Sequence, residues 1–199
     1  MNSYYKIKFF LKNMYFKFKN KPLQILLSVE PGGIVRSYMA HPSANIEPGA
    51  DIGDGTRVWA NTHIMRGAKI GKGCNIGENV HIASGVVIGD FCKIQNGVNI
   101  YNGVTVEDYV FFGPASQTTN ELHIGLLDSN GAPQKSWTIG YTVFKKGCAI
   151  GANATIVCGT KESPTVIGES SVVGSGSVVT KSVPKNTTVV GNPAKQISK

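Results

Sequence analysis

The sequence predicts an all-β fold in which the chain winds as a three-sided prism of short parallel strands. Three observations predict it: a large apolar residue every six positions, a small or β-branched residue two positions earlier, and glycines that recur every eighteen. Residues two apart on a strand share a face, so each six-residue unit turns one large and one small side chain inward. Helical spacings of three and four are absent, which argues against a helical repeat.

The six-residue period runs without a break from residue 44 to residue 112. The large positions are Ile46, Ile52, Val58, Ile64, Ile70, Ile76, Ile82, Ile88, Ile94, Ile100, Val106 and Phe112. The small positions are Ala44, Ala50, Thr56, Thr62, Ala68, Cys74, Val80, Val86, Cys92, Val98, Val104 and Val110. Gly53, Gly71 and Gly89 recur every eighteen residues, so three sides make one coil. Successive coils then stack as parallel strands about 4.8 Å apart.

The period breaks after Phe112 and returns at Phe144, which predicts an excursion loop over residues 113–143. The returning large positions are Phe144, Ile150, Ile156, Ile167, Val173 and Val179, with a five-residue bump at 161–165. A polar loop of this length in a compact domain is usually functional. We therefore expect it to leave the prism and to reach a neighbouring subunit or a ligand. The prism domain is assigned to residues 41–199.

The positive charge is concentrated in a basic, aromatic N-terminal extension over residues 1–40. The chain carries 20 Lys and Arg against 12 Asp and Glu, a net charge of +8, and six of the lysines lie in residues 1–21 without an acidic residue. The rest of the chain therefore has 14 basic residues against the same 12 acidic ones. This balance argues against a nucleic-acid groove on the prism, and we expect no nucleic-acid partner.

The segment 1–22 has two interpretations. Its aromatic and basic residues resemble an interfacial amphipathic helix on anionic lipid, whereas the alternation in YKIKF and FKFK favours a strand. Stacked-coil proteins need a cap at the open end of the core, and we favour that interpretation over peripheral membrane contact. No stretch approaches the roughly 18 apolar residues of a bilayer span, and no signal peptide is apparent. We expect a cytoplasmic protein, with membrane association as the alternative.

The cysteine pattern indicates packing and not chemistry. Cys74, Cys92 and Cys148 occupy the small inward position, where a thiol acts as a small hydrophobe. Cys158 lies off that position. No C-x-x-C pair is present, so metal and redox motifs have no support, and reduced thiols fit an intracellular location.

Five segments carry a resemblance to a known family: RVWANTHI (57–64), GDFCKIQNGVNIYNGVTVEDYVFFGP (89–114), TTN (118–120), IGANATIVCG (150–159) and VVGNPAKQI (189–197). They resemble the hexapeptide-repeat acyltransferases, whose fold is a left-handed parallel β-helix. Within that family they are most similar to N-acetyltransferases that act on nucleotide-linked 3-amino sugars in bacterial surface-polysaccharide (O-antigen) pathways. The handedness comes from the resemblance alone, because general crossover rules favour the right hand.

The resemblance implies a homotrimer that binds acetyl-CoA as a co-substrate in the groove between two prisms. It assigns the pantetheine arm to the backbone amides around Gly151, Ala152, Gly174 and Ser175, where small residues let a ligand approach the backbone. Lys181 and Lys195 are the candidates for the CoA phosphates. An ordinary solvated surface is the alternative for these two lysines.

The catalytic candidates follow from the same resemblance. Asn120 matches the TN position, where a neutral amide orients the attacking amine but cannot accept its proton; a turn-forming asparagine is the alternative. His123 is a candidate base, although this sequence departs from its relatives after TN, and a solvated loop histidine is the alternative. Gln95, Asn96 and Tyr101 belong to the IQN…Y string and are candidates for the sugar-nucleotide pocket, with exposed corner residues as the alternative.

His63 and His81 lie eighteen residues apart, so they are expected to stack one coil apart on one outer face. The same column contains Asn45, His63, His81, Asn99 and Gln117. Three interpretations remain open: a polar ladder at a subunit interface, a substrate contact, or a zinc site like that of the γ-class carbonic anhydrases. A zinc site needs three converging histidines, and neither His41 nor His123 has matching spacing, so we expect no metal.

The function expected from these residues is transfer of acetyl from acetyl-CoA to the amino group of a dTDP- or UDP-linked amino-deoxy sugar, with the amine at C3. The first alternative is O-acetylation of serine or a glycoside, for which hydroxyl attack needs a stronger base and His123 becomes indispensable. The second is a non-catalytic trimer that serves assembly. Fold alone does not decide among them.

Overall fold

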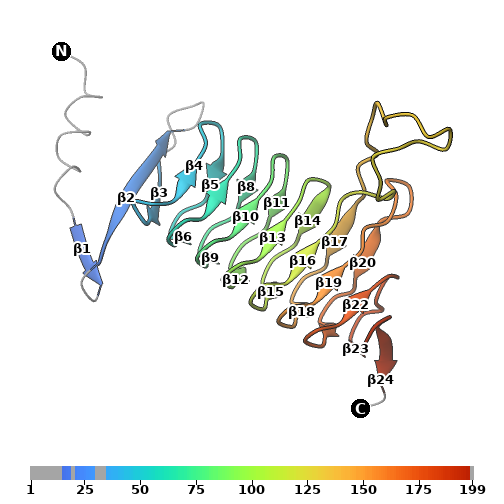
Figure 1. Cartoon of the computed structure of the whole chain (residues 1–199). Helices are drawn as coiled ribbons and strands as arrows, with labels where there is room; N and C mark the ends of the chain where they lie inside the picture. The colour runs from blue at the N-terminus through green and yellow to red at the C-terminus, as the bar shows by residue number, and fades with distance from the viewer. Residues whose placement is uncertain (1–14, 19–20, 30–34, 198–199) are drawn as a thin grey trace.

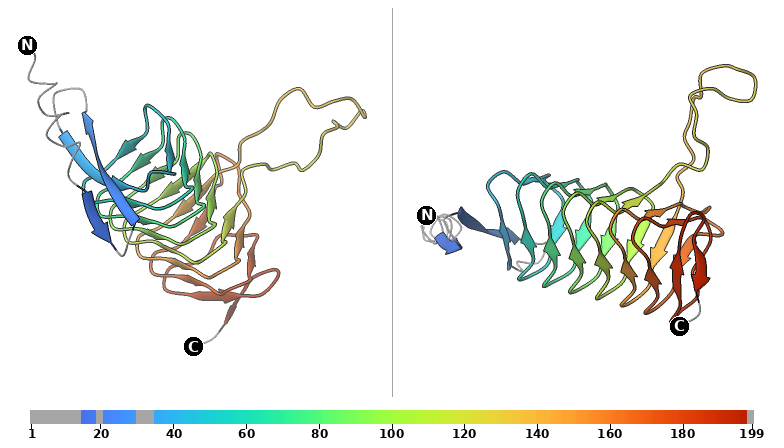
Figure 2. Two further views of the ribbon diagram at one scale, coloured as in Figure 1. Left: turned by 60° about the vertical axis from the view of Figure 1, so that its left-hand side comes forward. Right: turned by 60° about the horizontal axis from the view of Figure 1, so that its bottom comes forward.

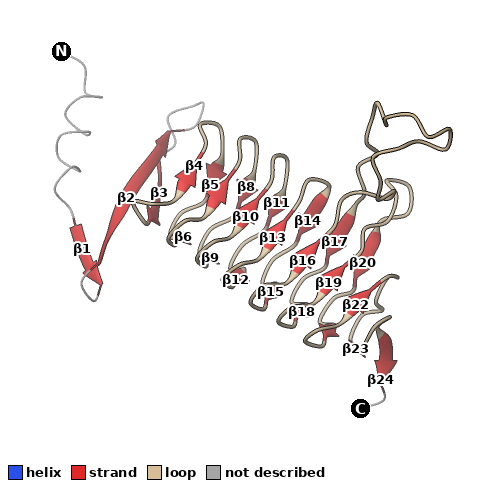
Figure 3. Ribbon diagram, viewed as in Figure 1, coloured by secondary structure: helices blue, strands red, loops and turns tan. Residues whose placement is uncertain are grey.

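The computed structural model describes residues 15–18, 21–29 and 35–197 of the 199-residue chain, with side chains from residue 37 onward. Every regular element in this part of the chain is a β-strand, and most are only two residues long (Figure 3). Short flat sides joined by tight corners are what a six-residue repeat predicts, and the all-β, left-handed parallel β-helix expected from the sequence is confirmed.

The strands form three sheets, which are the three sides of the prism (Figure 1). Sheet A contains β1 (Tyr15–Phe18), β2 (Lys21–Val29), β3 (Val35–Ala40), β6 (Arg57–Val58), β9 (Asn75–Ile76), β12 (Lys93–Ile94), β15 (Phe111–Phe112), β18 (Ala149–Ile150), β21 (Val172–Val173), β23 (Thr188–Val190) and β24 (Lys195–Ile197). Sheet B contains β4 (Asn45–Ile46), β7 (His63–Ile64), β10 (His81–Ile82), β13 (Asn99–Ile100), β16 (Gln117–Thr118), β19 (Thr155–Ile156) and β22 (Val178–Val179). Sheet C contains β5 (Asp51–Ile52), β8 (Lys69–Ile70), β11 (Val87–Ile88), β14 (Val104–Val106), β17 (Thr142–Phe144) and β20 (Thr165–Ile167).

The eighteen-residue period sets the register between coils. In sheet B, Ile82 pairs with Ile64 on one side and with Ile100 on the other, all in parallel. Each large apolar residue therefore stacks on its equivalent from the next coil, and a continuous apolar column runs along the inside of each sheet.

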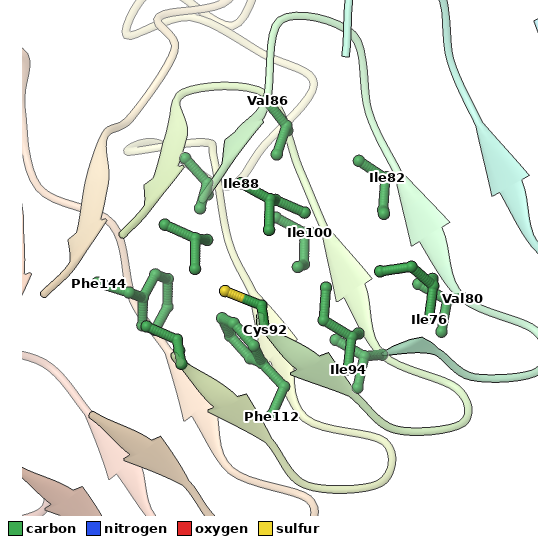
Figure 4. Packing of buried hydrophobic residues seen from close by; sticks show 14 of the residues in the cluster. Ile76, Val80, Ile82, Val86, Ile88, Cys92, Ile94, Ile100, Phe112 and Phe144 are labelled. Carbon is green, nitrogen blue, oxygen red and sulfur yellow. The ribbon is translucent and has the colours of Figure 1, made fainter. Parts of the chain in front are cut away.

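The interior of the prism holds the two inward columns that the sequence predicted. From Ile52 onward the large isoleucines are almost completely buried, and Cys92 lies near Ile94 of its own coil and Phe112 of the next one (Figure 4). Phe112 and Phe144 meet edge to face with ring centroids 4.8 Å apart, although the excursion loop separates them in sequence. All four cysteines are free and buried, including Cys158, as expected for packing residues.

Thr56 and Thr62 fit the small inward position because their hydroxyl groups find backbone partners, whereas the buried hydroxyl of Thr142 has no hydrogen-bond partner among the described residues. The Thr62 hydroxyl donates to the Gly77 carbonyl oxygen at 2.6 Å and accepts from the Val80 amide at 3.2 Å. Thr56 makes the same pair of bonds six residues earlier, on the preceding side of the coil. A buried hydroxyl with both bonds made costs little, which is why threonine replaces alanine here without disturbing the core.

The excursion begins later than the predicted range 113–143. Residues 113–118 continue the coil, because Gln117–Thr118 form β16 and pair with β13 and β19 in sheet B. Thr118 occupies a large inward position and is buried, and its hydroxyl accepts the Tyr101 amide at 3.0 Å. The apolar pattern breaks at this threonine while the backbone register continues, so the sequence placed the boundary too early.

The loop leaves the prism at Thr119 and returns at Tyr141. Its stem is closed by the Gly140 amide, which donates to the Asn120 carbonyl oxygen at 2.7 Å, and by a bridge between Glu121 and Ile139. Beyond this stem the loop projects away from the prism in both views of Figure 2. The expectation that this segment leaves the prism is confirmed.

The two ends of the prism carry antiparallel strands. β2 pairs with β1 and with β3, and β3 joins β6 in parallel, so the N-terminal hairpins extend sheet A beyond the first coil. β24 pairs antiparallel with β23 at the opposite end (Figure 1). Much of the segment 1–22 lies outside the described residues, so its role as cap or membrane contact stays a prediction. Within the described ranges, no helix is long and apolar enough to cross a bilayer.

Candidate functional site

A polar ladder runs along the outer face of sheet B. The parallel register places Asn45 beside His63, His63 beside His81, His81 beside Asn99 and Asn99 beside Gln117. These side chains alternate with the buried isoleucines, so they point away from the core. The predicted column of His63 and His81 on one outer face is therefore present.

Glu47 anchors one end of this ladder. Its Oε1 lies 2.8 Å from Nε2 of His63, and its Oε2 accepts the backbone amide of Arg66 at 2.9 Å. The Arg66 amide and then the His63 ring hold the pKa of the Glu47 carboxyl below its usual value. An ionised carboxylate only accepts hydrogen bonds, so Nε2 of His63 carries the hydrogen in this contact.

His81 lies between two rings from the adjacent coils. The His63 ring meets it edge to face with centroids 5.4 Å apart, and the Tyr101 ring lies on the other side at 5.7 Å. Burial, and next the nearby His63, lower the pKa of His81 below its usual value of about 6.5, while Glu47 acts in the opposite direction. The imidazole is therefore neutral at pH 7 and able to accept a proton.

The far end of the ladder is closed by an amide pair. Asn99 donates from Nδ2 to Oε1 of Gln117 at 2.6 Å. Gln117 in turn donates from Nε2 to the carbonyl oxygens of Gly97 and Ala115, each at 3.1 Å. These bonds fix the orientation of both amides and engage both amide hydrogens of Gln117, whereas Asn99 uses one of its hydrogens.

The remaining acceptor-site candidates divide between two corners. Tyr101 follows β13 and joins the histidines, and the register places Thr119, the first residue of the loop, one coil further on in the same corner. Gln95 and Asn96 precede β13 at the opposite edge of sheet B, and the Asn96 Oδ1 accepts the Glu78 amide at 3.0 Å. The structure therefore brings Tyr101 to the histidines, but it does not bring Gln95 and Asn96 there.

Asn120 and His123 both lie on the excursion loop. The Asn120 carbonyl oxygen closes the stem of the loop by its bond to Gly140, and its side chain is half-buried. His123 is exposed beyond the stem. Asn120 thus has a fixed position beside the corner that contains Tyr101, while His123 extends with the loop away from the prism.

The four residues assigned to the pantetheine arm lie on one corner of adjacent coils. Gly151 stacks directly on Gly174, and a Cβ added at Gly151 would lie 2.7 Å from the Gly174 carbonyl carbon. Ala152 accepts the Gly176 amide through its carbonyl oxygen, and Ser175 is exposed. Close stacking of the coils by itself requires glycine at position 151, so its presence is no separate evidence for a ligand.

The two candidate phosphate ligands lie in the last coils. Lys181 follows β22, and Lys195 begins β24, paired with Val190 of β23. Both side chains are exposed, and Val190 lies against Gly174. Lys195 is therefore at the same end of the prism as the pantetheine candidates.

Metal ligation was the third interpretation of the histidine column. Among residues whose placement is described, no group of three or more His, Cys, Asp or Glu side chains is arranged to hold a metal ion. His41 bonds instead to the Ser43 hydroxyl through Nδ1 at 2.8 Å.

Glu47 is the site residue that the sequence reasoning missed. A signal for it existed, because Glu47 and Tyr101 occupy equivalent positions of the repeat, each two residues after a member of the outward column. A carboxylate in that column, next to a histidine in the adjacent one, indicates an ion pair along the face of the prism.

Comparison with known proteins supports the repeat first. The family described as bacterial transferase hexapeptide (six repeats) matches residues 49–84, and the hexapeptide repeat of succinyl-transferase matches residues 67–102 and 146–181. The chain is 47% identical over 58 residues to dTDP-3-amino-3,6-dideoxy-alpha-D-galactopyranose 3-N-acetyltransferase of Aneurinibacillus thermoaerophilus, which is 29% of this chain and 28% of that protein.

Solved structures extend the likeness to most of the chain. A mutant of GDP-perosamine N-acetyltransferase from Caulobacter crescentus, in complex with CoA and GDP-perosamine, is 22% identical with a TM-score of 0.52, over 84% of this chain and 59% of that one. A maltose O-acetyltransferase from Clostridium difficile 630 is 24% identical with a TM-score of 0.55, over 63% and 66%. At these identities the likeness shows the fold.

The repeat and the three-sided parallel fold define the class, a hexapeptide-repeat protein. Within that class, the resemblance to the acyltransferases, and locally to a 3-amino-sugar N-acetyltransferase, is confirmed. The chain spans less than two thirds of the length of the perosamine enzyme, and the match to the 3-amino-sugar enzyme spans 28% of it.

Proposed function

We propose that the protein transfers the acetyl group of acetyl-CoA to the amino group of a nucleotide-linked amino-deoxy sugar, with dTDP or UDP as the nucleotide and the amine at C3. The observation that carries this proposal is the 47% identity over 58 residues to a 3-N-acetyltransferase of a dTDP-linked sugar. The parallel β-helix and the polar ladder on sheet B are consistent with it. The product would serve bacterial surface-polysaccharide synthesis, including O-antigen.

The mechanism requires a neutral amine beside the thioester carbonyl. An alkyl amine near the lysine reference of about 10.4 is mostly protonated at pH 7, so the site must favour its neutral form. Asn120, whose backbone carbonyl oxygen is held by the stem of the loop, would orient this amine through its side-chain amide. Holding the two reactants together is itself worth about 7–11 kcal/mol of the barrier in favourable cases.

The acetyl-CoA site would follow the corner formed by Gly151, Ala152, Gly174 and Ser175. This assignment comes from the resemblance to the acyltransferases, because the close stacking of the coils already accounts for Gly151. Lys181 and Lys195, both exposed in the last coils, would meet the phosphates. In this proposal the nucleotide end of CoA would lie near the C-terminal strands and the thioester nearer the excursion loop.

We expect the active form to be a homotrimer in which the groove between two prisms completes the site. The excursion loop supports this, because Ile124, Leu126 and Leu127 are between 61% and 98% exposed on the part of the loop that projects from the prism. Apolar side chains in such a position are typical of a surface that another chain covers. A closed three-fold ring covers all three loops equally.

We also place the protein in the cytoplasm, with peripheral membrane contact through residues 1–22 as the alternative to a capping role. Four free, buried cysteines are consistent with a reducing compartment.

A thiol-release assay tests the function directly. Acetyl-CoA is incubated with dTDP- and UDP-linked 3-amino and 4-amino sugars, with GDP-linked amino sugars, with serine and with simple glycosides. Transfer to a dTDP- or UDP-linked 3-amino sugar, confirmed by mass spectrometry of the amide, is the expected result. Release of thiol with none of the amino sugars would contradict the proposal.

O-acetylation is the second candidate, and the fold likeness to a maltose O-acetyltransferase keeps it in the panel. In that case maltose or serine is acetylated, and replacing His123 by alanine abolishes transfer because a hydroxyl needs a base. For amine transfer we expect the same variant to retain most of its activity, since His123 is exposed beyond the loop stem.

A further inference from the structure

The two histidines of the ladder on sheet B differ in how many ring nitrogens are engaged within the described part of the chain. His63 donates from Nε2 to Glu47 at 2.8 Å and keeps Nδ1 without a partner there, while Asn99 donates to Gln117 at 2.6 Å. Across the part of the chain that the structure describes, neither ring nitrogen of His81 has a hydrogen-bond partner. Asn45 at the outer end is also unpaired, but an amide does not accept a proton at neutral pH.

The surroundings of His81 keep it neutral and accessible. Its ring lies between the His63 ring and the Tyr101 ring, so its plane is restrained from both adjacent coils. The titratable groups that face it are His63 on β7, Glu47 in the turn after β4, and Tyr101 after β13. Burial and the charge of a protonated His63 both favour the neutral imidazole.

We propose that His81 is the proton acceptor for the attacking amine, with His63 and Glu47 as positioning residues that control its protonation. The inference rests on the proposed acetyl transfer, and it gives the base a position on the rigid prism instead of on the exposed loop at His123. A base held by packed rings on a strand keeps its geometry better than one on a projecting loop.

The substrate ammonium group gives one proton to water as the amine enters the site. The neutral amine attacks the thioester carbonyl, and a C–N bond forms. His81 takes the proton from the nitrogen of the tetrahedral adduct. The C–S bond then breaks, and His81 returns the proton to the departing sulfur, so that the products are the amide and the free thiol of CoA.

His81→Asn removes the proton acceptor with little change in shape, because asparagine occupies the equivalent outward position at 45 and 99. The kcat and KM are measured from pH 5 to pH 8 with saturating acetyl-CoA and the accepted amino sugar. We expect kcat to fall at least about 100-fold, KM to change by less than a few fold, and the acidic limb of the kcat profile to disappear.

His63→Asn tests the positioning residues. It removes the charge that lowers the pKa of His81 and leaves Glu47, which raises it, so the acidic limb of the kcat profile should move to higher pH. A residue that only filled space would not move this limb. His41→Asn is the matched control, because His41 bonds to Ser43 outside the ladder, and its profile should equal that of the unmodified protein.

The outcomes separate the two proposals. If the unmodified protein acetylates no amino sugar, the proposed function is wrong and the role of His81 with it. If it is active and His81→Asn keeps its kcat and its acidic limb, with or without a higher KM, only the role of His81 is overturned. Circular dichroism confirms that each variant is folded, and His81→Gln replaces His81→Asn if the latter is not.

Discussion

Ala115 occupies the left-handed backbone region, with φ of 55°, at a corner where the coil one turn away has Gly97 at φ of 71°. An L-residue in this region costs about 1–2 kcal/mol, whereas glycine adopts it freely. The methyl group of Ala115 therefore brings strain that its neighbour avoids.

We predict that Ala115→Gly raises the free energy of unfolding by about 1 kcal/mol and that Gly97→Ala lowers it by about as much. A Cβ added at Gly97 would lie 3.8 Å from Ala115, an ordinary van der Waals distance. The change in unfolding free energy of Gly97→Ala therefore reports backbone strain and not a steric clash. Urea denaturation followed by circular dichroism measures both. A loss of stability in Ala115→Gly would contradict the strain argument.

The cysteines provide a second residue-scale prediction. Each is at most 7% exposed, and burial raises the pKa of Cys148 to about 12, so its thiol stays protonated at pH 8. We expect the folded protein to react with Ellman's reagent at least about tenfold more slowly than the protein in guanidinium chloride, where all four thiols react. Rapid labelling of the folded protein would show that the reagent reaches the inward thiols, which would contradict their burial.

At the scale of elements, the excursion loop is separable from the prism. Its stem is closed by the bond between Gly140 and Asn120 before the chain projects outward, and the core columns continue across it through Phe112 and Phe144. The loop therefore contributes little to the folding of the coils that flank it.

Replacing residues 122–138 by a short Gly-Ser turn should preserve the strand signal in circular dichroism and lower the melting temperature by only a few degrees. The same variant should lose acetyl transfer and association, because the exposed apolar residues of the loop are gone. Replacing residues 129–132 alone, at the far turn, is the matched control. An unfolded product would show that the loop belongs to the core.

The N-terminal hairpins are the second element with a testable role. β2 and β3 pair over six residues and continue sheet A past the first coil, which is where a cap is needed. We predict that deletion of residues 1–22 lowers the melting temperature and leaves flotation with anionic liposomes unchanged. If the full chain floats with the liposomes and the chain without residues 1–22 does not, the N-terminal segment contacts the membrane.

At the scale of the whole molecule, the proposed trimer predicts a particle of three times the 21.2 kDa chain mass. Sedimentation equilibrium measures this without any substrate. The joint variant Ile124→Ser and Leu127→Ser should weaken the association while the prism stays folded, because it removes exposed apolar area without touching the core. If the protein sediments as a monomer at micromolar concentration, no groove between two prisms exists, and the proposed acetyl-CoA site is wrong.

The repeat made most of the fold readable from the sequence. Every six-residue unit obeys the same local rule, so the inward isoleucines and the column containing His63 and His81 followed from counting alone. Counting failed at Thr118, where a hydroxyl replaces an apolar side chain and bonds to the backbone of the previous coil. The family resemblance grouped Gln95 and Asn96 with Tyr101 in one string, but the structure separates them, because they lie at opposite edges of β13.

The three-sided coil, its register and the outward column on sheet B could be predicted from the sequence, because all of these repeat with the six- and eighteen-residue periods. Which members of that column are hydrogen-bonded to one another emerged only from the tertiary structure. Glu47 binds His63, Asn99 binds Gln117, and His81 is left without a hydrogen-bond partner in the described part of the chain. A hydrogen bond depends on the direction of each side chain and on the distance between its atoms and those of the next coil. The spacing of residues in the sequence predicts neither quantity.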